Sequence, residues 1–246
     1  MDKIKLSNVD DKIWLAYKTN MVFYSSEFYT PDECNEIKVI SNKRGVNFYS
    51  YGVFKDAERK MVAFSAEEEK KLFYPLELLK IKANTKFLNL KHRDFLGSIM
   101  ALGIKREKLG DLILKNDCCY LPVAKDMVDF IKYNLQYINK SPCKISLLDI
   151  INDEIPQYSF EERVIITTSN RLDSMVSSLC NVSRSKSIEW IEMGNILIDY
   201  VPVCKKDYRV KANSVITVRG YGKYRIGDIL GYTQKDRIKI EIKKFI

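Results

Sequence analysis

The sequence lacks several features that membrane, secreted and metal-dependent proteins carry. It has a single histidine, His92, and its six cysteines form no CxxC pair, so a structural zinc site has too few ligands. No run of about 18 apolar residues occurs, and the start of the chain has no apolar segment of the kind found in signal peptides. We therefore expect a cytoplasmic protein with reduced thiols, no bound metal and no membrane partner.

Motifs for nucleotide cofactors are also missing. The chain contains neither the phosphate-binding pattern GxxxxGK[ST] nor the dinucleotide fingerprint GxGxxG, and no glycine-rich turn of the kind that methyltransferases use follows a first strand. We expect no cofactor and no small-molecule substrate.

Positive charge is plentiful and unevenly distributed. The chain of 246 residues has a net charge of +9, and residues 170–246 hold 15 Lys and Arg against 8 Asp and Glu, a net of +7. A basic region of this kind is typical of proteins that bind nucleic acid. The positive charge therefore indicates that the last third of the chain binds nucleic acid.

The stretch from Arg171 to Ile226 is the most informative. Leu172, Met175, Val176 and Leu179 have helical spacing and predict one short helix. Ser183 or Ser185 can cap a second helix, for which Gly194 provides a left-handed stop. After Gly194 apolar residues alternate as in strands. The stretch predicts two short helices that meet at a corner, followed by a β-hairpin.

Candidate RNA-binding residues cluster on this stretch. Arg184 and Lys186 lie in the first turn of the second helix, where the helix dipole favours acids, so they suggest a phosphate ligand. By the same reasoning, glutamates at both positions would leave the fold intact. Tyr221 and Tyr224 offer ring faces for stacking. The alternative interpretation is that these basic residues are ordinary solvent-exposed surface charges without a ligand. The candidates here are Arg171, Ser183, Arg184, Ser185, Lys186, Arg219, Lys223 and Arg225.

Residues 76–150 predict a ferredoxin-like βαββαβ domain, similar to an RNA-recognition motif. The aromatic signature of that motif is absent, so stacking on the sheet does not follow. Gly103 and Gly110 frame a basic loop that could approach phosphates, although a tight helix-to-strand loop would explain it equally well. The expected elements are 76–81, 93–102, 111–114, 118–123, 125–138 and 144–148, and the candidate contacts are Lys105, Arg106, Lys108, His92 and Arg93.

The remaining segments complete an α+β fold. Residues 1–75 form an N-terminal α/β region, with helices expected over 10–23 and 30–43, weak strands within 46–54 and a charged loop at 57–60. Residues 151–169 are expected to be an acidic linker with a lead-in strand, which keeps clear of RNA and lets the C-terminal domain, residues 170–246, reorient.

Several of these motifs resemble known families. The Arg171-Leu172-Asp173 opening, Ser183-Arg184, Gly194 and Arg219 resemble the RNA-binding domain named after small-subunit ribosomal protein S-four. Asp199-Tyr200 and Asn213-Ser214 depart from the Asn-Gly and Gly-Asp of that domain. With AERK at 57–60 and HRDFLGSIMALGIKREKLGD at 92–111, the chain resembles the YlmH family of bacterial RNA-binding proteins over roughly residues 28–226.

The resemblance implies partners that composition and spacing do not. It implies binding to ribosomal RNA and tRNA on the large ribosomal subunit that carries a stalled nascent chain. It also implies cooperation with the tailing factor of ribosome quality control, which extends stalled chains with alanine.

Two other classes of function remain open. Pseudouridine synthases also carry such domains and use an Arg-Leu-Asp segment, but Asp173 is followed by Ser174-Met175-Val176 where those enzymes have a Thr-Ser-Gly run. We interpret Asp173 as a carboxylate that stabilises a helix start, and we interpret His92 as too isolated for a hydrolase, so no enzyme is expected. A protein-interaction module would instead show weak salt dependence and no affinity for RNA.

Overall fold

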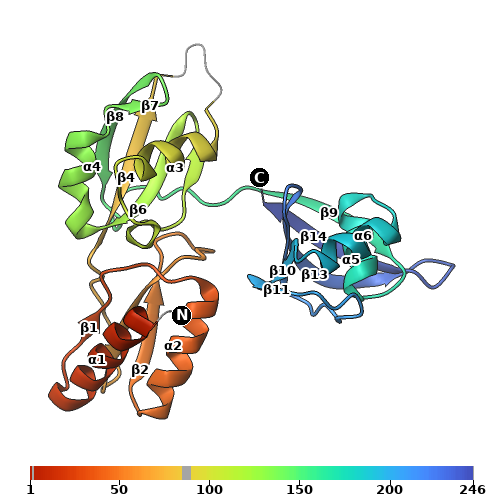
Figure 1. Cartoon of the computed structure of the whole chain (residues 1–246), viewed down its shortest axis with the longest axis horizontal. Helices are drawn as coiled ribbons and strands as arrows, with labels where there is room; N and C mark the ends of the chain where they lie inside the picture. The colour runs from red at the N-terminus through yellow and green to blue at the C-terminus, as the bar shows by residue number, and fades with distance from the viewer. Residues whose placement is uncertain (2, 85–89, 246) are drawn as a thin grey trace. The chain divides into compact units, whose positions relative to one another are not determined.

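The computed structural model describes residues 1, 3–84 and 90–245. The chain divides into two compact units, residues 1–157 and 158–246 (Figure 1). Both units combine helices with sheets whose neighbouring strands are antiparallel, which confirms the predicted α+β class.

The first unit begins with a small helix-and-sheet layer. Its elements are α1 (Lys3–Thr19), β1 (Phe23–Tyr24), α2 (Pro31–Lys43), β2 (Asn47–Tyr51) and β3 (Met61–Ser65), and the sheet order is β1-β3-β2. Thr30 caps α2 as predicted, because its hydroxyl accepts from the Glu33 amide and the Glu33 carboxylate accepts from the Thr30 amide. The first helix was expected over 10–23, but α1 starts at Lys3 and ends before β1.

The rest of this unit has the predicted ferredoxin-like topology. Its sheet has the order β5-β6-β4-β8-β7, and Phe95 and Ile99 of α3 with Val128 and Ile131 of α4 pack on one face. The second helix is shorter than expected over 125–138, because the chain leaves helical geometry at Leu135 and enters β7. The elements are β4 (Leu76–Ala83), α3 (His92–Met100), η1 (Arg106–Lys108), β5 (Ile113–Lys115), β6 (Cys118–Ala124), η2 (Lys125–Met127), α4 (Val128–Asn134), β7 (Tyr137–Ile138) and β8 (Ser141–Leu148).

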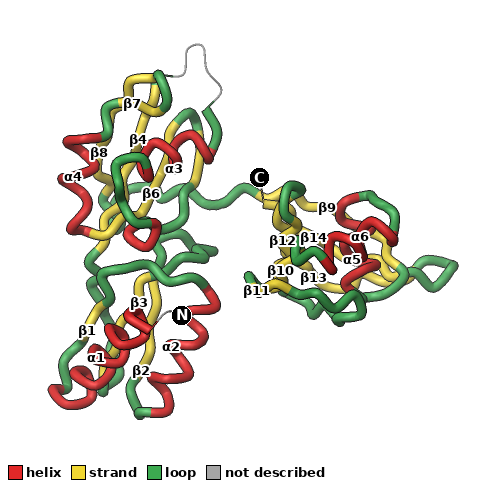
Figure 2. The backbone as a smooth tube through the Cα atoms, in the orientation of Figure 1, coloured by secondary structure: helices red, strands yellow, loops and turns green. Residues whose placement is uncertain are grey.

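The second unit packs two short helices on a sheet of order β11-β10-β12-β13-β14-β9. Figure 2 shows the helices, α5 and α6, side by side. The elements are β9 (Phe160–Thr167), α5 (Leu172–Cys180), α6 (Arg184–Glu192), β10 (Ile196–Ile198), β11 (Val201–Pro202), β12 (Val215–Val218), β13 (Gly222–Tyr232) and β14 (Ile238–Phe245).

This sheet corrects two expectations. A linker was predicted over the acidic residues before 163, but β9 begins at Phe160 and pairs with β14 along its whole length. Glu162 lies directly opposite Lys243, and their charged atoms are 2.8 Å apart. Opposite charges at facing positions stabilise strand pairing. These acids therefore belong to the C-terminal sheet, and the expected hairpin is part of six strands.

The residues that depart from the S-four pattern lie in tight turns. Asp199 and Tyr200 both have positive φ, 47° and 74°, and Ile198 pairs with Val201 across them. This is the geometry of a two-residue hairpin turn, for which Asn-Gly is the common sequence. The Asp199 carboxylate also accepts from the Val215 amide at 2.7 Å. Asn213 has a φ of 67°, a conformation that asparagine tolerates well.

Candidate nucleic-acid interface

The corner between α5 and α6 is built on Asp173, whose side chain is 1% exposed. Arg171 donates to its two carboxylate oxygens at 3.2 Å, and Arg184 donates through Nε and Nη2 at 3.0 and 2.8 Å. The Ser187 hydroxyl donates to the Asp173 carbonyl at 2.8 Å. One buried carboxylate thus joins the starts of both helices.

These contacts also govern the ionisation of the carboxylate. Burial would raise the pKa of Asp173, but hydrogen bonds from Arg171 and Arg184 outweigh it and hold that pKa below its usual value. Reciprocally, the hydrogen bond to Asp173 raises the pKa of Arg171. A buried carboxylate that bonds to two guanidinium groups belongs to the framework of the corner. This supports the structural interpretation of Asp173 over a role as the nucleophile of a pseudouridine synthase.

The corner corrects the explanation given for its positive charges. Arg184 begins α6 against the dipole because Asp173 compensates it, so this placement by itself does not imply a phosphate. Lys186 pairs with Glu189 at 2.9 Å on the helix surface. Of the two predicted candidates for the N-cap, Ser183 is the one that caps α6 and accepts from the Lys186 amide at 3.2 Å, while Ser185 is exposed in the first turn.

The cations of β13 lie on the opposite face of the sheet from α5 and α6. Tyr224 and Ile226 belong to the core beneath these helices, so alternation directs Lys223 and Arg225 away from them. There the charged groups lie over aromatic rings. The Lys223 ammonium is 5.4 Å from the Tyr200 ring and 5.3 Å from the Phe245 ring, and Arg225 is 5.7 Å from the Phe160 ring and 5.5 Å from the Phe245 ring.

The tyrosines expected to stack on bases have other environments. Tyr224 is 3% exposed and its pKa is raised by burial, so that expectation is wrong for it. Tyr221 is 48% exposed, and its ring centroid lies 4.5 Å from that of Trp190 on α6. Arg219 is exposed in the turn before Tyr221, and its amide donates to the Asn195 carbonyl at 3.0 Å. The predicted contacts of this unit therefore occupy two faces and one turn.

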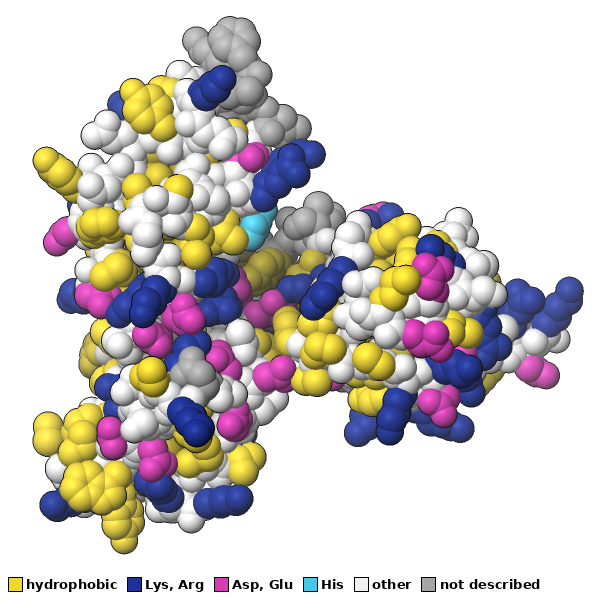
Figure 3. Space-filling view, in the orientation of Figure 1, with side chains coloured by type: hydrophobic (Ala, Val, Ile, Leu, Met, Phe, Trp, Pro, Cys, Tyr) yellow, Lys and Arg dark blue, Asp and Glu magenta, His cyan; other side chains and the backbone are white. Residues whose placement is uncertain are grey.

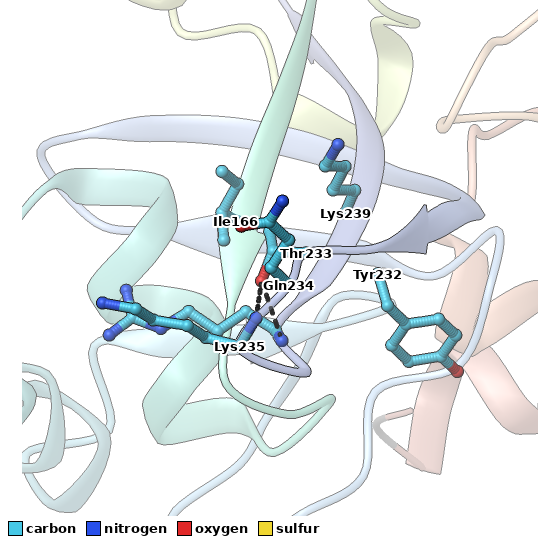
Figure 4. A pocket seen from close by; sticks show the side chains of 7 residues that line it. Ile166, Tyr232, Thr233, Gln234, Lys235 and Lys239 are labelled. Carbon is cyan, nitrogen blue, oxygen red and sulfur yellow. Dashed lines mark hydrogen bonds between the residues drawn. The ribbon is translucent and has the colours of Figure 1, made fainter.

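A basic hollow that the sequence did not indicate lies near the end of the β13–β14 hairpin (Figure 4). It has a volume of about 510 Å³, and its lining includes Ile166 of β9 and Lys239 of β14, which lie opposite each other in the sheet. The turn is ordered by Thr233, whose hydroxyl accepts from the amides of Lys235 and Arg237. Figure 3 shows dark blue side chains at this end of the unit. The only sequence signal was the density of Lys and Arg after Gly227.

The basic loop of the first unit has mainly structural contacts. Arg106 donates to the carbonyls of Leu109 and Gly110 at 2.6 and 3.0 Å. Lys108 donates to the Ser26 carbonyl at 3.1 Å and to the Asp126 carboxylate at 2.6 Å, which ties the N-terminal layer to the ferredoxin-like part. Lys105, by contrast, is exposed. The tight-loop interpretation of this segment is the better one for Arg106 and Lys108.

The segments 57–60 and 92–111 contact each other. Asp111 accepts from the backbone amides of Glu58 and Arg59, and the Arg59 guanidinium donates to the carbonyls of Phe28 and Leu109 at 3.2 Å. A side chain at Gly110 would approach Phe28 and Pro122 to 3.0 Å. These motifs therefore hold two layers of the unit together.

His92 and Arg93 are exposed in the first turn of α3. Across residues 1, 3–84 and 90–245, no three His, Cys, Asp or Glu side chains are grouped to hold a metal ion. Within the same residues, no helix is both long and apolar enough to cross a membrane.

Known proteins resemble this chain in sequence and fold. Residues 69–152 match the family described as "Putative RNA-binding domain in YlmH". The chain is 26% identical over 221 residues to ribosome-associated protein quality control protein P2 of Bacillus subtilis (strain 168), covering 89% of this chain and 86% of that protein. The structure of the cell division protein ylmH from Streptococcus pneumoniae is similar in fold, with a TM-score of 0.53 and 17% identity, over 63% of this chain and 94% of that one.

Proposed function

We propose that this chain is a YlmH-type, non-catalytic protein that binds RNA on the ribosome. The observation that carries the proposal is the net charge of +7 on residues 170–246, much of it exposed on the second unit. The match of residues 69–152 to an RNA-binding domain and the name of the Bacillus relative support the same class of ligand.

The corner suits a phosphate ligand although its arginines are paired. Arg171 and Arg184 use one edge of each guanidinium group for Asp173, and their side chains remain 37% and 55% exposed. Each arginine has five N–H donors, so the outer donors remain available to phosphate oxygens. Asp173 therefore holds both groups in place before the RNA arrives, which reduces the entropy lost on binding. Lys186 adds positive charge at the start of α6, while Arg219 and the cations of the β13–β14 hairpin add it elsewhere on the same unit.

The finer proposal names the particle. The chain binds ribosomal RNA and tRNA on a large subunit with a stalled nascent chain, and it supports alanine tailing together with the tailing factor of ribosome quality control. The name of the Bacillus relative supports the ribosome and quality control.

Co-sedimentation with purified large subunits over a salt series tests this function. A ligand held by phosphate contacts makes log affinity fall linearly with log salt, by about 0.7 to 0.9 per contact. The double variant Lys186→Gln/Arg219→Gln should weaken binding and flatten the slope by nearly two contacts, because both residues are exposed and neither bonds to Asp173.

The matched control is Lys38→Gln/Lys43→Gln, which removes the same charge from the surface of α2 in the first unit. It should bind like the unmodified chain. A flat salt response of the unmodified protein, or equal binding by the two double variants, would contradict the proposal. The first outcome would favour a protein-interaction module.

A further inference from the structure

The ferredoxin-like sheet has a second face that α3 and α4 do not cover. Alternation along β4 places Leu79 and Ile81 in the core with these helices, so Lys80 and Lys82 point to the other side. Lys80 lies opposite Tyr120 of β6 and Ser146 of β8. The register therefore assembles side chains from several strands on one surface.

Further lysines join this surface from the neighbouring strands. Lys82 lies opposite Cys118 of β6 and Lys144 of β8, and Cys118 in turn faces Lys115 of β5. On β7, Tyr137 lies opposite Pro142, two residues before Lys144, which places it on the same face. We call this surface the lysine face, and it comprises Lys80, Lys82, Lys115, Lys144, Tyr120 and Tyr137.

The lysine face is open only on one part of the sheet. The strand ends nearest the N-terminal layer are closed, because Leu76 and Ala124 pack there with Phe28 and Met61. Farther along, Lys82, Lys115 and Lys144 are exposed and form no ion pair with any residue that the structure describes. The open part is therefore a positive surface without internal neutralisation.

The charge arrangement is unfavourable in the absence of a ligand. Lys82 and Lys144 occupy facing positions on neighbouring strands, where like charges destabilise a sheet. No aspartate or glutamate is a member of the outward-facing rows of β4, β5, β6 and β8 around them. A polyanion would neutralise these lysines, so electrostatic complementarity favours a nucleic acid.

The aromatic rings indicate which form of nucleic acid fits. The Lys80 ammonium lies 5.7 Å from the centroid of the half-buried Tyr120 ring, and Tyr137 is 55% exposed. Only unpaired bases can stack on such rings, whereas a duplex presents its backbone and grooves. We infer that the lysine face binds a single-stranded RNA segment, with phosphates at the lysines and bases on Tyr120 and Tyr137.

This inference rests on the proposed RNA-binding function for the class of ligand, but it uses a surface of the other unit. The test is a titration of the full chain with a fluorescent oligouridine of about twelve nucleotides, a length within the range that small domains cover. The variant Lys82→Gln/Lys115→Gln/Lys144→Gln should lower the salt slope by about two, at roughly 0.7 per contact for single strands.

The control is Lys125→Gln/Lys132→Gln/Lys140→Gln, which removes the same charge from exposed positions of the same domain outside the lysine face. It should keep the slope. Tyr120→Leu should weaken oligouridine binding about tenfold without changing the slope, because stacking involves no counterions. Unchanged urea unfolding curves would show that the variants are folded.

Equal slopes for the two triple variants would overturn the inference. So would binding of an oligoglutamate of equal charge as tightly as the oligouridine, because that would show a general anion surface. The two proposals fail separately. Lys186→Gln/Arg219→Gln should reduce binding to large subunits and leave oligouridine binding unchanged, whatever the lysine face does.

Discussion

Replacing Asp173 by asparagine is the sharpest test of how the corner is held together. The change keeps the size of the side chain and an oxygen that can accept from the Ser174 amide, now 2.9 Å away. It removes the charge that receives hydrogen bonds from Arg171 and Arg184. The variant therefore isolates the ionic contribution to the corner.

The loss of stability expected for Asp173→Asn depends on how exposed Arg171 and Arg184 are to water. Breaking a fully buried ion pair costs about 3 to 5 kcal/mol because the remaining charge is stranded. Here the guanidinium groups are 37% and 55% exposed and can be solvated, so we expect about 1 to 2 kcal/mol. For a unit of this size, the melting temperature should fall by roughly 4 to 16 °C.

The stability of the second unit at acid pH should depend on the same carboxylate. Because the folded pKa of Asp173 is lowered, its contribution is complete above the unfolded value, about 3.9, and is lost as the pH falls through the folded pKa. The stability of the second unit should therefore decline below about pH 4, and Asp173→Asn should lack that part of the decline. Thermal unfolding by circular dichroism, repeated from neutral to acid pH, measures both effects.

Charge reversal at two neighbouring positions supplies the control. Arg184→Glu places a second carboxylate against Asp173 and should cost about 2 kcal/mol, more than Arg184→Gln. Lys186→Glu replaces a surface pair with Glu189 by a like-charge pair, which the helix dipole offsets in part, and should change stability by less than about 0.5 kcal/mol. Equal melting of Arg184→Glu, Asp173→Asn and the unmodified chain, with identical acid profiles, would refute the ionic account of the corner.

Four further variants probe packing, helix propensity and capping, each followed by urea unfolding. Gly110→Ala should destabilise the first unit by about 1 to 3 kcal/mol, because the added methyl group would contact Phe28. Gly97→Ala should stabilise the unit by about 0.5 to 1 kcal/mol, because Gly97 lies within a helix and has open space beside it. Similar effects of the two substitutions would contradict the packing argument. Leu179→Ala should cost about 2 to 5 kcal/mol in the second unit, and a loss below 1 kcal/mol would show a loosely packed core. Thr30→Ala should cost about 1 kcal/mol because α2 loses its N-cap, and an unchanged free energy of unfolding would contradict a stabilising role of this cap.

The sequence determined what depends on neighbouring residues. The starts of α2 and α6 follow from Thr30 and Ser183, since a capping hydroxyl bonds to amides within three residues. Gly194 has a φ of 72°, as its position after α6 required. The order of strands and helices in residues 76–150 also follows from local periodicity, and it selects the ferredoxin-like topology.

Only the tertiary structure decided which charges and rings are available to a ligand. Arg184, Arg106 and Lys108 look alike in sequence as free cations, but their partners come from distant residues or from backbone carbonyls. Tyr224 is turned into the core by the pairing of β13, which the tyrosine itself does not encode. The lysine face exists because strand register aligns Lys82 with Lys144, sixty-two positions later in the chain. Pairing of this kind depends on the folding of the whole sheet, so inspection of one segment cannot reveal it.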